Sequence, residues 1–230
     1  MPRPAEMAPL GGRTPPAGSP EPELARFSRS VRLIHRLTAV FTLTCIGTAA
    51  LLYVGALQVL VGHRHLVGLV HVYSGFALPV PLLAGLVSRA YRGDLRLLNR
   101  FGNRDWLWLR SRTRRDGRIP VGKFNAGQKL NGALSAGAIA VLLLSGTVMY
   151  FTGLTRISWR TGATFVHDWF ALALGLLVAG HIAFAMRDPD ALRGMRTGVV
   201  SLTWAKREHG DWADEQAAAP PVPVTQPGPR

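Results

Sequence analysis

The sequence predicts an all-α membrane protein, a bundle of four transmembrane helices with polar, proline-rich ends. Two observations indicate this fold class. Four apolar stretches are each long enough to cross a hydrocarbon layer, which takes about 20 residues of helix, and they cover residues 37–61, 66–87, 130–153 and 163–186. The basic residues lie almost entirely in segments that the topology places on one side of the membrane.

The charge of the chain predicts its orientation. The 230 residues include 27 Lys and Arg against 13 Asp and Glu, a formal net charge of +14. Of the basic residues, 24 lie before the first apolar stretch, between the second and the third, or after the fourth. Because loops rich in Lys and Arg stay in the cytoplasm, we expect a multi-pass protein of the cytoplasmic membrane with both termini inside. Nucleic acid is not an expected partner, since topology explains the basic excess.

The polar segments divide the rest of the chain. Residues 1–29 form a Pro-rich cytoplasmic extension whose composition predicts disorder. The transmembrane domain covers residues 30–186 and contains a charged, glycine-bearing cytoplasmic loop at 88–129, where we expect at most short helices. A cytoplasmic segment follows at 187–213, and the tail at 214–230 is again predicted to be disordered. The first apolar stretch is too long for a signal-peptide core, so it is expected to remain as an anchor.

The single thiol, Cys45, limits the cofactors that this chain can hold. One cysteine excludes a disulfide framework, a four-cysteine zinc or iron–sulfur site and the two-cysteine attachment of a covalent haem. Any redox cofactor must therefore be held noncovalently.

Four of the seven histidines lie in or beside the apolar stretches, at His35, His71, His167 and His181. Ionisable groups there are costly and usually face a bundle interior or a cofactor. The topology places His35 and His181 toward the cytoplasmic side, and His71 and His167 toward the outer side. Since the 14 residues from His167 to His181 amount to about 21 Å and nearly four turns, both rings share one helix face. We therefore predict an outer pair, His71 with His167, and an inner pair, His35 with His181.

Two histidine pairs stacked across a four-helix bundle suit two b-type haems, because each iron takes one imidazole from either side of the macrocycle. Zinc is a poorer fit, since it requires four closely grouped ligands. We expect the second ring nitrogen of each ligand to donate to a backbone carbonyl one turn earlier, for example from His181 to Leu177.

The other three histidines are interpreted as solvated. His63 and His65 flank Arg64 in the first outer loop, and His209 lies in the C-terminal segment. Among them, His65 is the one serious rival to His71 as a ligand.

The segment just before the third apolar stretch has two interpretations. Residues 123–131 read Lys-Phe-Asn-Ala-Gly-Gln-Lys-Leu-Asn. Asn125 with Gln128 three residues later is typical of a capping box at a helix start. The same amides, together with the free N–H groups of a helix N-terminus, could also hydrogen-bond a quinone near the inner pair.

Further motifs follow the fourth stretch, where the chain reads Gly-Met-Arg-Thr-Gly-Val-Val at 194–200, then Trp204-Ala205-Lys206 and Trp212. With the 123–131 segment and the histidine spacing, they closely resemble the gamma subunit, the cytochrome b subunit, of membrane-bound formate dehydrogenases. The resemblance covers about residues 30–213. Four apolar helices with histidines are shared by the wider group of di-haem, cytochrome b561-like membrane proteins, including hydrogenase cytochromes.

The resemblance implies a non-catalytic electron-transfer subunit of an oxidoreductase complex. In that family an extracytoplasmic iron–sulfur beta subunit supplies electrons, two haems b carry them across the membrane, and menaquinone is reduced on the cytoplasmic side. Formate oxidation belongs to a separate molybdenum or tungsten alpha subunit. By position, the resemblance assigns His71 and His167 to the outer haem iron, His35 and His181 to the inner haem iron, and Asn125, Gly127 and Gln128 to quinone binding.

Three alternatives stay open at this point. The chain could be the cytochrome b subunit of a hydrogenase or of another molybdopterin oxidoreductase. It could be a transporter whose membrane histidines relay protons, although the matched histidine depths and the lack of Asp or Glu near the midplane of the apolar stretches count against this. A purely structural membrane anchor is the third alternative, and it predicts no haem.

Overall fold

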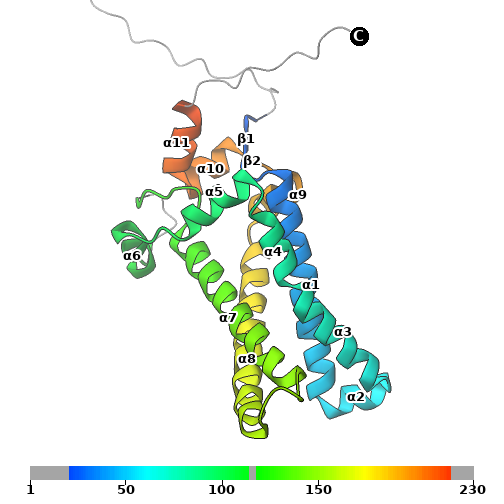
Figure 1. Cartoon of the computed structure of the whole chain (residues 1–230). Helices are drawn as coiled ribbons and strands as arrows, with labels where there is room; N and C mark the ends of the chain where they lie inside the picture. Colours follow the sequence, from blue (N-terminus) through cyan, green and yellow to red (C-terminus); the bar gives the residue numbers. More distant parts are fainter. Residues whose placement is uncertain (1–20, 114–117, 219–230) are drawn as a thin grey trace, which may run out of the picture.

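The computed structural model describes residues 21–113 and 118–218. Four long apolar segments dominate it: α1 (Arg29–Tyr53), α3 (Arg64–Ala77) continued by α4 (Pro79–Gly85), α7 (Ala126–Tyr150) and α8 (Ile157–Met186) (Figure 1). Each segment is long and apolar enough to cross a membrane. The predicted fold class, an all-α membrane protein with four spans, is confirmed.

The first span does not coincide with the apolar stretch that predicts it. Helix α1 begins at Arg29, because the Ser28 hydroxyl caps it by accepting a hydrogen bond from the Val31 amide at 3.3 Å. The helix ends before the extended residue Val54, and the last part of the stretch forms a separate helix, α2 (Gly55–Val61). Hydropathy locates the buried middle of a span, whereas capping decides where its helix begins.

The second span consists of two helical pieces. Helix α4 begins with Pro79 directly after Leu78, which keeps right-handed helical backbone angles. Proline lacks an amide hydrogen and is tolerated in the first turn of a helix. The chain therefore stays helical across the junction, and both pieces pack along α1 (Figure 1).

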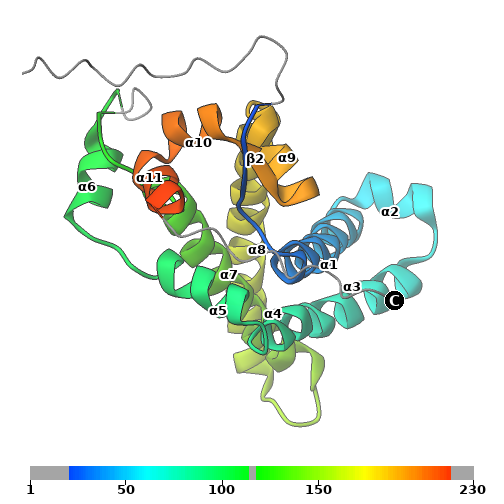
Figure 2. The same cartoon turned by 90° about the horizontal axis from the view of Figure 1, so that it is seen from above.

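The spans form two hairpins, α1 with α3–α4 and α7 with α8, which lie side by side (Figure 2). A small buried cluster lies where they meet, formed by Leu78, Ala138, Ile139 and Leu174. Many other apolar side chains on the spans are exposed, as expected of helices that face lipid tails.

The remaining elements gather at one end of the bundle, which we call the cap end (Figure 1). Two short helices of the central loop, α5 (Arg89–Leu98) and α6 (Asn103–Arg110), lie there. The C-terminal segment adds α9 (Pro189–Thr197), α10 (Leu202–Glu208) and α11 (Gly210–Ala218).

A two-stranded antiparallel sheet joins the two ends of the described chain. Strand β1 (Glu23–Ala25) pairs with β2 (Val199–Ser201), with Leu24 opposite Val200. Around it lies a small core separate from the membrane spans, formed by Val200, Trp204, Ala205, Trp212 and Ala213. The cap therefore folds around apolar side chains of its own.

This cap includes residues for which the composition predicts disorder. Strand β1 lies within the 1–29 extension, and the end of α11 lies within the 214–230 tail. The apolar Leu24 packs against the cap core. The average composition of a Pro-rich segment does not reveal a contact made by one residue. The rest of both predicted disordered regions, residues 1–20 and 219–230, lies outside the described residues, as do residues 114–117.

The prediction that His209 is solvated is wrong. The side chain is buried, with 1% exposure, between α10 and α11. It is hydrogen-bonded to the carbonyl of Gly122 at 2.8 Å and to the guanidinium of Arg26 at 2.9 Å. In contrast, His63 and His65 are exposed, as expected.

Candidate functional site

The inner histidine pair lies toward the cap end of the bundle. His35, near the start of α1, faces His181, near the end of α8, with ring centroids 6.3 Å apart and planes inclined by 57°. The two residues are far apart in the sequence and lie on different hairpins. The structure thus brings together the two side chains that the depth argument pairs.

The outer pair lies toward the opposite end. His71 of α3 faces His167 of α8, with ring centroids 6.2 Å apart and planes inclined by 66°. Gly146 of α7 lets the imidazole approach closely, since a Cβ there would lie 3.3 Å from Cε1 of His167. Helix α8 therefore supplies one histidine to each pair.

Two buried hydroxyls fix the outer rings. Nδ1 of His71 lies 2.9 Å from the Thr48 hydroxyl of α1, and Nδ1 of His167 lies 3.0 Å from the Ser145 hydroxyl of α7. Each hydroxyl also lies 2.6–2.7 Å from the carbonyl four positions earlier in its own helix. Because a hydroxyl has one hydrogen, it donates to that carbonyl and accepts from the imidazole. Both rings then carry their proton on Nδ1, which leaves the Nε2 lone pair free to bind a metal.

These hydrogen bonds differ from the predicted ones, in which each ring nitrogen donates to a backbone carbonyl one turn earlier in its own helix. In the outer pair the acceptors are side chains of a neighbouring helix. The expected bond from the His181 ring to the Leu177 carbonyl is not among the side-chain hydrogen bonds of residues 21–113 and 118–218. Sequence reasoning missed Thr48 and Ser145, and the signal that could have found them is a hydroxyl inside an apolar span at the depth of the outer histidines.

The ring spacing fits one iron between the members of each pair. A metal–imidazole bond is about 2.0 Å long, so two imidazoles on opposite sides of one iron have centroids roughly 6 Å apart. A zinc-type donor set is absent from the described chain, where no three His, Cys, Asp or Glu side chains come together. The donor chemistry and the spacing therefore fit a haem that the two histidines of each pair would hold.

The capping interpretation of the loop before α7 is confirmed. The Asn125 Oδ1 accepts from the Gln128 amide at 2.9 Å, and the Gln128 Oε1 accepts from the Asn125 amide at 3.0 Å. These bonds use only the oxygens of the two side chains, so both NH₂ groups stay outside the capping box. Gly127 lies against the ring of Trp108, to which a Cβ would come within 3.3 Å.

Two ion pairs hold this helix start in place. Lys123 bonds Asp94 of α5 at 2.5 Å, and Lys129 bonds Asp105 of α6 at 2.8 Å. All four side chains are at most 17% exposed. Breaking a buried pair by removing one partner costs about 3–5 kcal/mol. The lysines on either side of Asn125 therefore fasten α5 and α6 to the start of α7.

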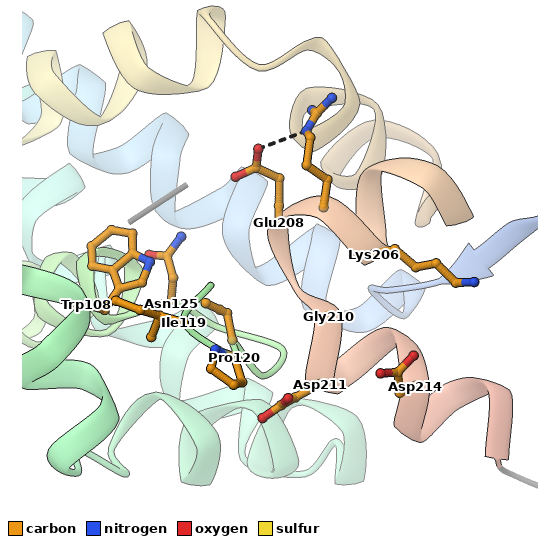
Figure 3. A pocket seen from close by; sticks show the side chains of 11 residues that line it. Trp108, Ile119, Pro120, Asn125, Lys206, Glu208, Gly210, Asp211 and Asp214 are labelled. Atoms are coloured by element: carbon orange, nitrogen blue, oxygen red, sulfur yellow. Dashed lines mark hydrogen bonds and ion pairs between the residues drawn. The ribbon is translucent and has the colours of Figure 1, made fainter. Parts of the chain in front are cut away.

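Two cavities border Asn125. One of about 540 Å³ lies between α6 and the start of α7, and Asp105, Trp108 and Lys129 are part of its wall. The other, of about 190 Å³, lies between Trp108 and the α10–α11 region of the cap, as Figure 3 shows. Gly127 and Gln128 line neither cavity, so of the three residues assigned to quinone it is Asn125 that reaches both.

A four-span helical bundle with two histidine pairs across it defines a membrane protein suited to haem. A family model described as prokaryotic cytochrome b561 matches residues 26–198. The chain belongs to this family, and membership implies haem b as its cofactor.

The chain is also similar to cytochrome b subunits of formate dehydrogenases. The cytochrome b556 subunit of Haemophilus influenzae formate dehydrogenase is 34% identical over 100 residues, which cover 41% of each chain. The cytochrome b556(Fdn) subunit of the nitrate-inducible Escherichia coli enzyme is 31% identical over 98 residues, covering 41% of this chain and 45% of the relative. The alignments thus span less than half the length of these relatives.

Proposed function

We propose that this chain is the membrane cytochrome b subunit of a respiratory formate dehydrogenase, which transfers electrons from an extracytoplasmic iron–sulfur subunit to menaquinone at the cytoplasmic side of the cell membrane. The pairing of four histidines at two depths, each pair spaced for one iron, is the observation that carries this proposal. The similarity to formate dehydrogenase subunits supports the kind of complex. Haem b, when bound, supplies one-electron oxidation and reduction.

In this proposal His71 and His167 hold the outer haem, and His35 and His181 hold the inner one. Thr48 and Ser145 orient the outer rings through Nδ1, as the ligands of a metal centre are commonly oriented by their neighbours.

The quinone site is proposed at the start of α7, on the same end of the bundle as the inner pair. The NH₂ groups of Asn125 and Gln128 can donate to a quinone oxygen, and the free amides and positive dipole of a helix N-terminus stabilise negative charge that develops there. Gly127 permits the close approach of Trp108, which forms a wall beside Asn125.

The cap end is proposed to face the cytoplasm. In the sequence, 24 of the 27 Lys and Arg residues lie before the first apolar stretch, between the second and the third, or after the fourth, whereas Arg64, Arg156 and Arg160 lie near the other end of the bundle. This asymmetry supports both termini being inside. Protons for quinol formation would then enter from the cytoplasm through the cavities that border Asn125.

Haem analysis of purified variants tests the pairing. The unaltered protein should contain two haems b, and each histidine-to-alanine variant should contain one. His71→Ala and His167→Ala should retain a haem with the same redox potential, and His35→Ala and His181→Ala should share a second, different potential. His63→Ala is the control, because this exposed histidine should leave both haems in place. A colourless protein, or loss of the same haem from the His35 and His71 variants, would contradict the proposal.

The quinone site is tested with two variants at one position. Gln128→Ala removes both the cap and the NH₂ donor, whereas Gln128→Glu keeps the capping oxygen and removes the donor. Both should leave the haems reducible and slow menaquinone reduction, roughly tenfold or more if the donor stabilises developing negative charge. Stopped-flow oxidation of the reduced haems by a menaquinone analogue measures this rate. If the Gln128→Glu variant oxidised its haems at the rate of the unaltered protein, the Gln128 side chain would have only its capping role and would not bind quinone.

The nature of the electron donor is tested on the native complex. Formate added to the purified assembly should reduce the haems. If hydrogen reduced the haems and formate did not, the electron donor would be a hydrogenase and the formate dehydrogenase assignment would be wrong. The histidine assignments would not be affected.

A further inference from the structure

Helix α6 is attached by one face to the beginning of a transmembrane helix. Its Asp105 pairs with Lys129, and its Trp108 packs against Gly127. Both partners lie in the first turn of α7, which starts at Ala126. Helix α6 is therefore level with the end of a membrane span, and it projects sideways from the bundle (Figures 1 and 2).

The opposite face of α6 is apolar and exposed. Residues 105 and 108 share one side of the helix, so the 100° step per residue places 106, 107 and 110 on the other. Trp106 is 54% exposed and Leu107 is 60% exposed. Phe101, just before the helix, packs edge-on against Trp106 with ring centroids 5.2 Å apart, and it is itself 42% exposed.

Positive charge flanks these apolar side chains. Arg100 precedes them and Arg110 ends the helix, and both are exposed. Arg104, on the side of the helix, pairs with Asp211. The exposed face thus combines aromatic and aliphatic groups with Arg110. Arg100 lies next to it in the chain, beside Phe101, and also borders the cavity between α6 and α7. Among residues 21–113 and 118–218, neither Arg100 nor Arg110 has a carboxylate partner.

We propose that this face of α6, formed by Phe101, Trp106, Leu107, Arg100 and Arg110, binds anionic phospholipids of the leaflet at the cap end. Its level matches the membrane boundary, where aromatic rings are enriched and amphipathic helices lie in the plane of the bilayer. The two arginines complement the phosphate groups of anionic lipids. The partner is therefore the bilayer itself, and the proposal does not depend on which complex the chain serves.

Depth measurement by a spin label tests this proposal directly. Cys45 is the one cysteine of the chain, so a Cys45→Ala background allows a single label at Trp106→Cys. In phosphatidylcholine vesicles that contain phosphatidylglycerol, the labelled protein should be more accessible to oxygen than to a water-soluble nickel complex. The control is Lys206→Cys on the exposed surface of α10 in the cap, which should show the reverse order. A water-like result at position 106 would overturn the proposal.

Lipid retention provides a second measurement in the unlabelled protein. Arg100→Gln combined with Arg110→Gln should reduce the phosphatidylglycerol that remains bound in native mass spectrometry by about twofold or more, since two lipid-facing charges are removed. Lys206→Gln combined with Arg207→Gln removes the same charge elsewhere and should leave retention unchanged. Equal retention in both double variants would contradict the lipid assignment.

In the protein labelled at position 106, concentration-dependent spin–spin broadening would identify a contact between two copies of the chain. That result would overturn the proposal that this face binds lipid.

Discussion

Arg26 is a buried charge that ties both ends of the described chain to the loop before α7. Its Nη2 donates to the Lys123 carbonyl at 2.7 Å and to Nε2 of His209 at 2.9 Å. The guanidinium also lies over the rings of Trp204 and Trp212, at 4.8 and 5.1 Å from their centroids. Burial lowers the pKa of Arg26 to about 10, which leaves the side chain charged at neutral pH.

The contact with Arg26 also fixes the tautomer of His209. A guanidinium has donors and no acceptor, so Nε2 of His209 accepts and Nδ1 donates to the Gly122 carbonyl. The sequence could not predict this burial, because His209 follows a run of charged residues, and its partner Arg26 lies 183 positions away. The charged residues just before His209 indicate only that this part of α10 has an exposed side. They do not reveal the contact between His209 and Arg26.

Removing the Arg26 guanidinium should loosen the cap. Arg26→Met keeps an unbranched side chain and leaves the buried His209 Nε2 and Lys123 carbonyl without their donor, each at a cost of about 1–3 kcal/mol. We expect faster hydrogen exchange in residues 199–218 and unchanged haem content, since the histidine pairs lie in the spans. Arg207→Met is the control, because this arginine is 60% exposed and pairs with its neighbour Glu208. Unaltered exchange in Arg26→Met would show that the cap is held by other contacts.

At the scale of the element, the junction between α9 and β2 depends on one glycine. Gly198 ends α9 with a φ of 96°, in the left-handed region that glycine adopts without strain. Its carbonyl accepts from the amides of Arg26 at 2.8 Å and Phe27 at 3.1 Å. A Cβ at this position would lie 2.7 Å from the Phe27 carbonyl oxygen.

Gly198→Ala should therefore destabilise the attachment of the N-terminal strand. The backbone strain alone costs about 1–3 kcal/mol, and the clash with a main-chain oxygen cannot be relieved by a rotamer change. Thermal unfolding of the cap, followed by tryptophan fluorescence, should shift to lower temperature. Gly210→Ala is a matched control, because a Cβ there has no neighbour within 4 Å. Equal unfolding temperatures for the two variants would contradict the prediction.

Helix existence was easier to predict than helix ends. The hydrophobic stretches identify all four spans because lipid exposure requires long apolar helices. The ends depend on local groups, such as the Ser28 cap that starts α1 before the apolar stretch and the extended Val54 that separates α1 from α2. In the cap, the strand pair forms between residues 23–25 and 199–201, a contact between remote segments that no periodicity signals.

At the scale of the whole molecule, the histidine pairs connect the two hairpins. His35 belongs to α1 and His71 to α3, whereas both of their partners belong to α8. The sequence predicted which rings meet, because depth in a membrane follows from topology and rise per residue. It did not predict Thr48 and Ser145, because the rotation of each helix about its own axis decides which hydroxyl reaches a ring, and hydropathy leaves that rotation undetermined.

Helix α8 has one further consequence. It runs without interruption from Ile157 to Met186, and one member of each pair projects from it. The distance between the outer and the inner histidine pair along the bundle is therefore set by this one helix. If the other three spans slid along it, His167 and His181 would keep their spacing. Inserting one residue between His167 and His181 would turn one ring by about 100° relative to the other, so the length of this interval is constrained even where its side chains are free to vary.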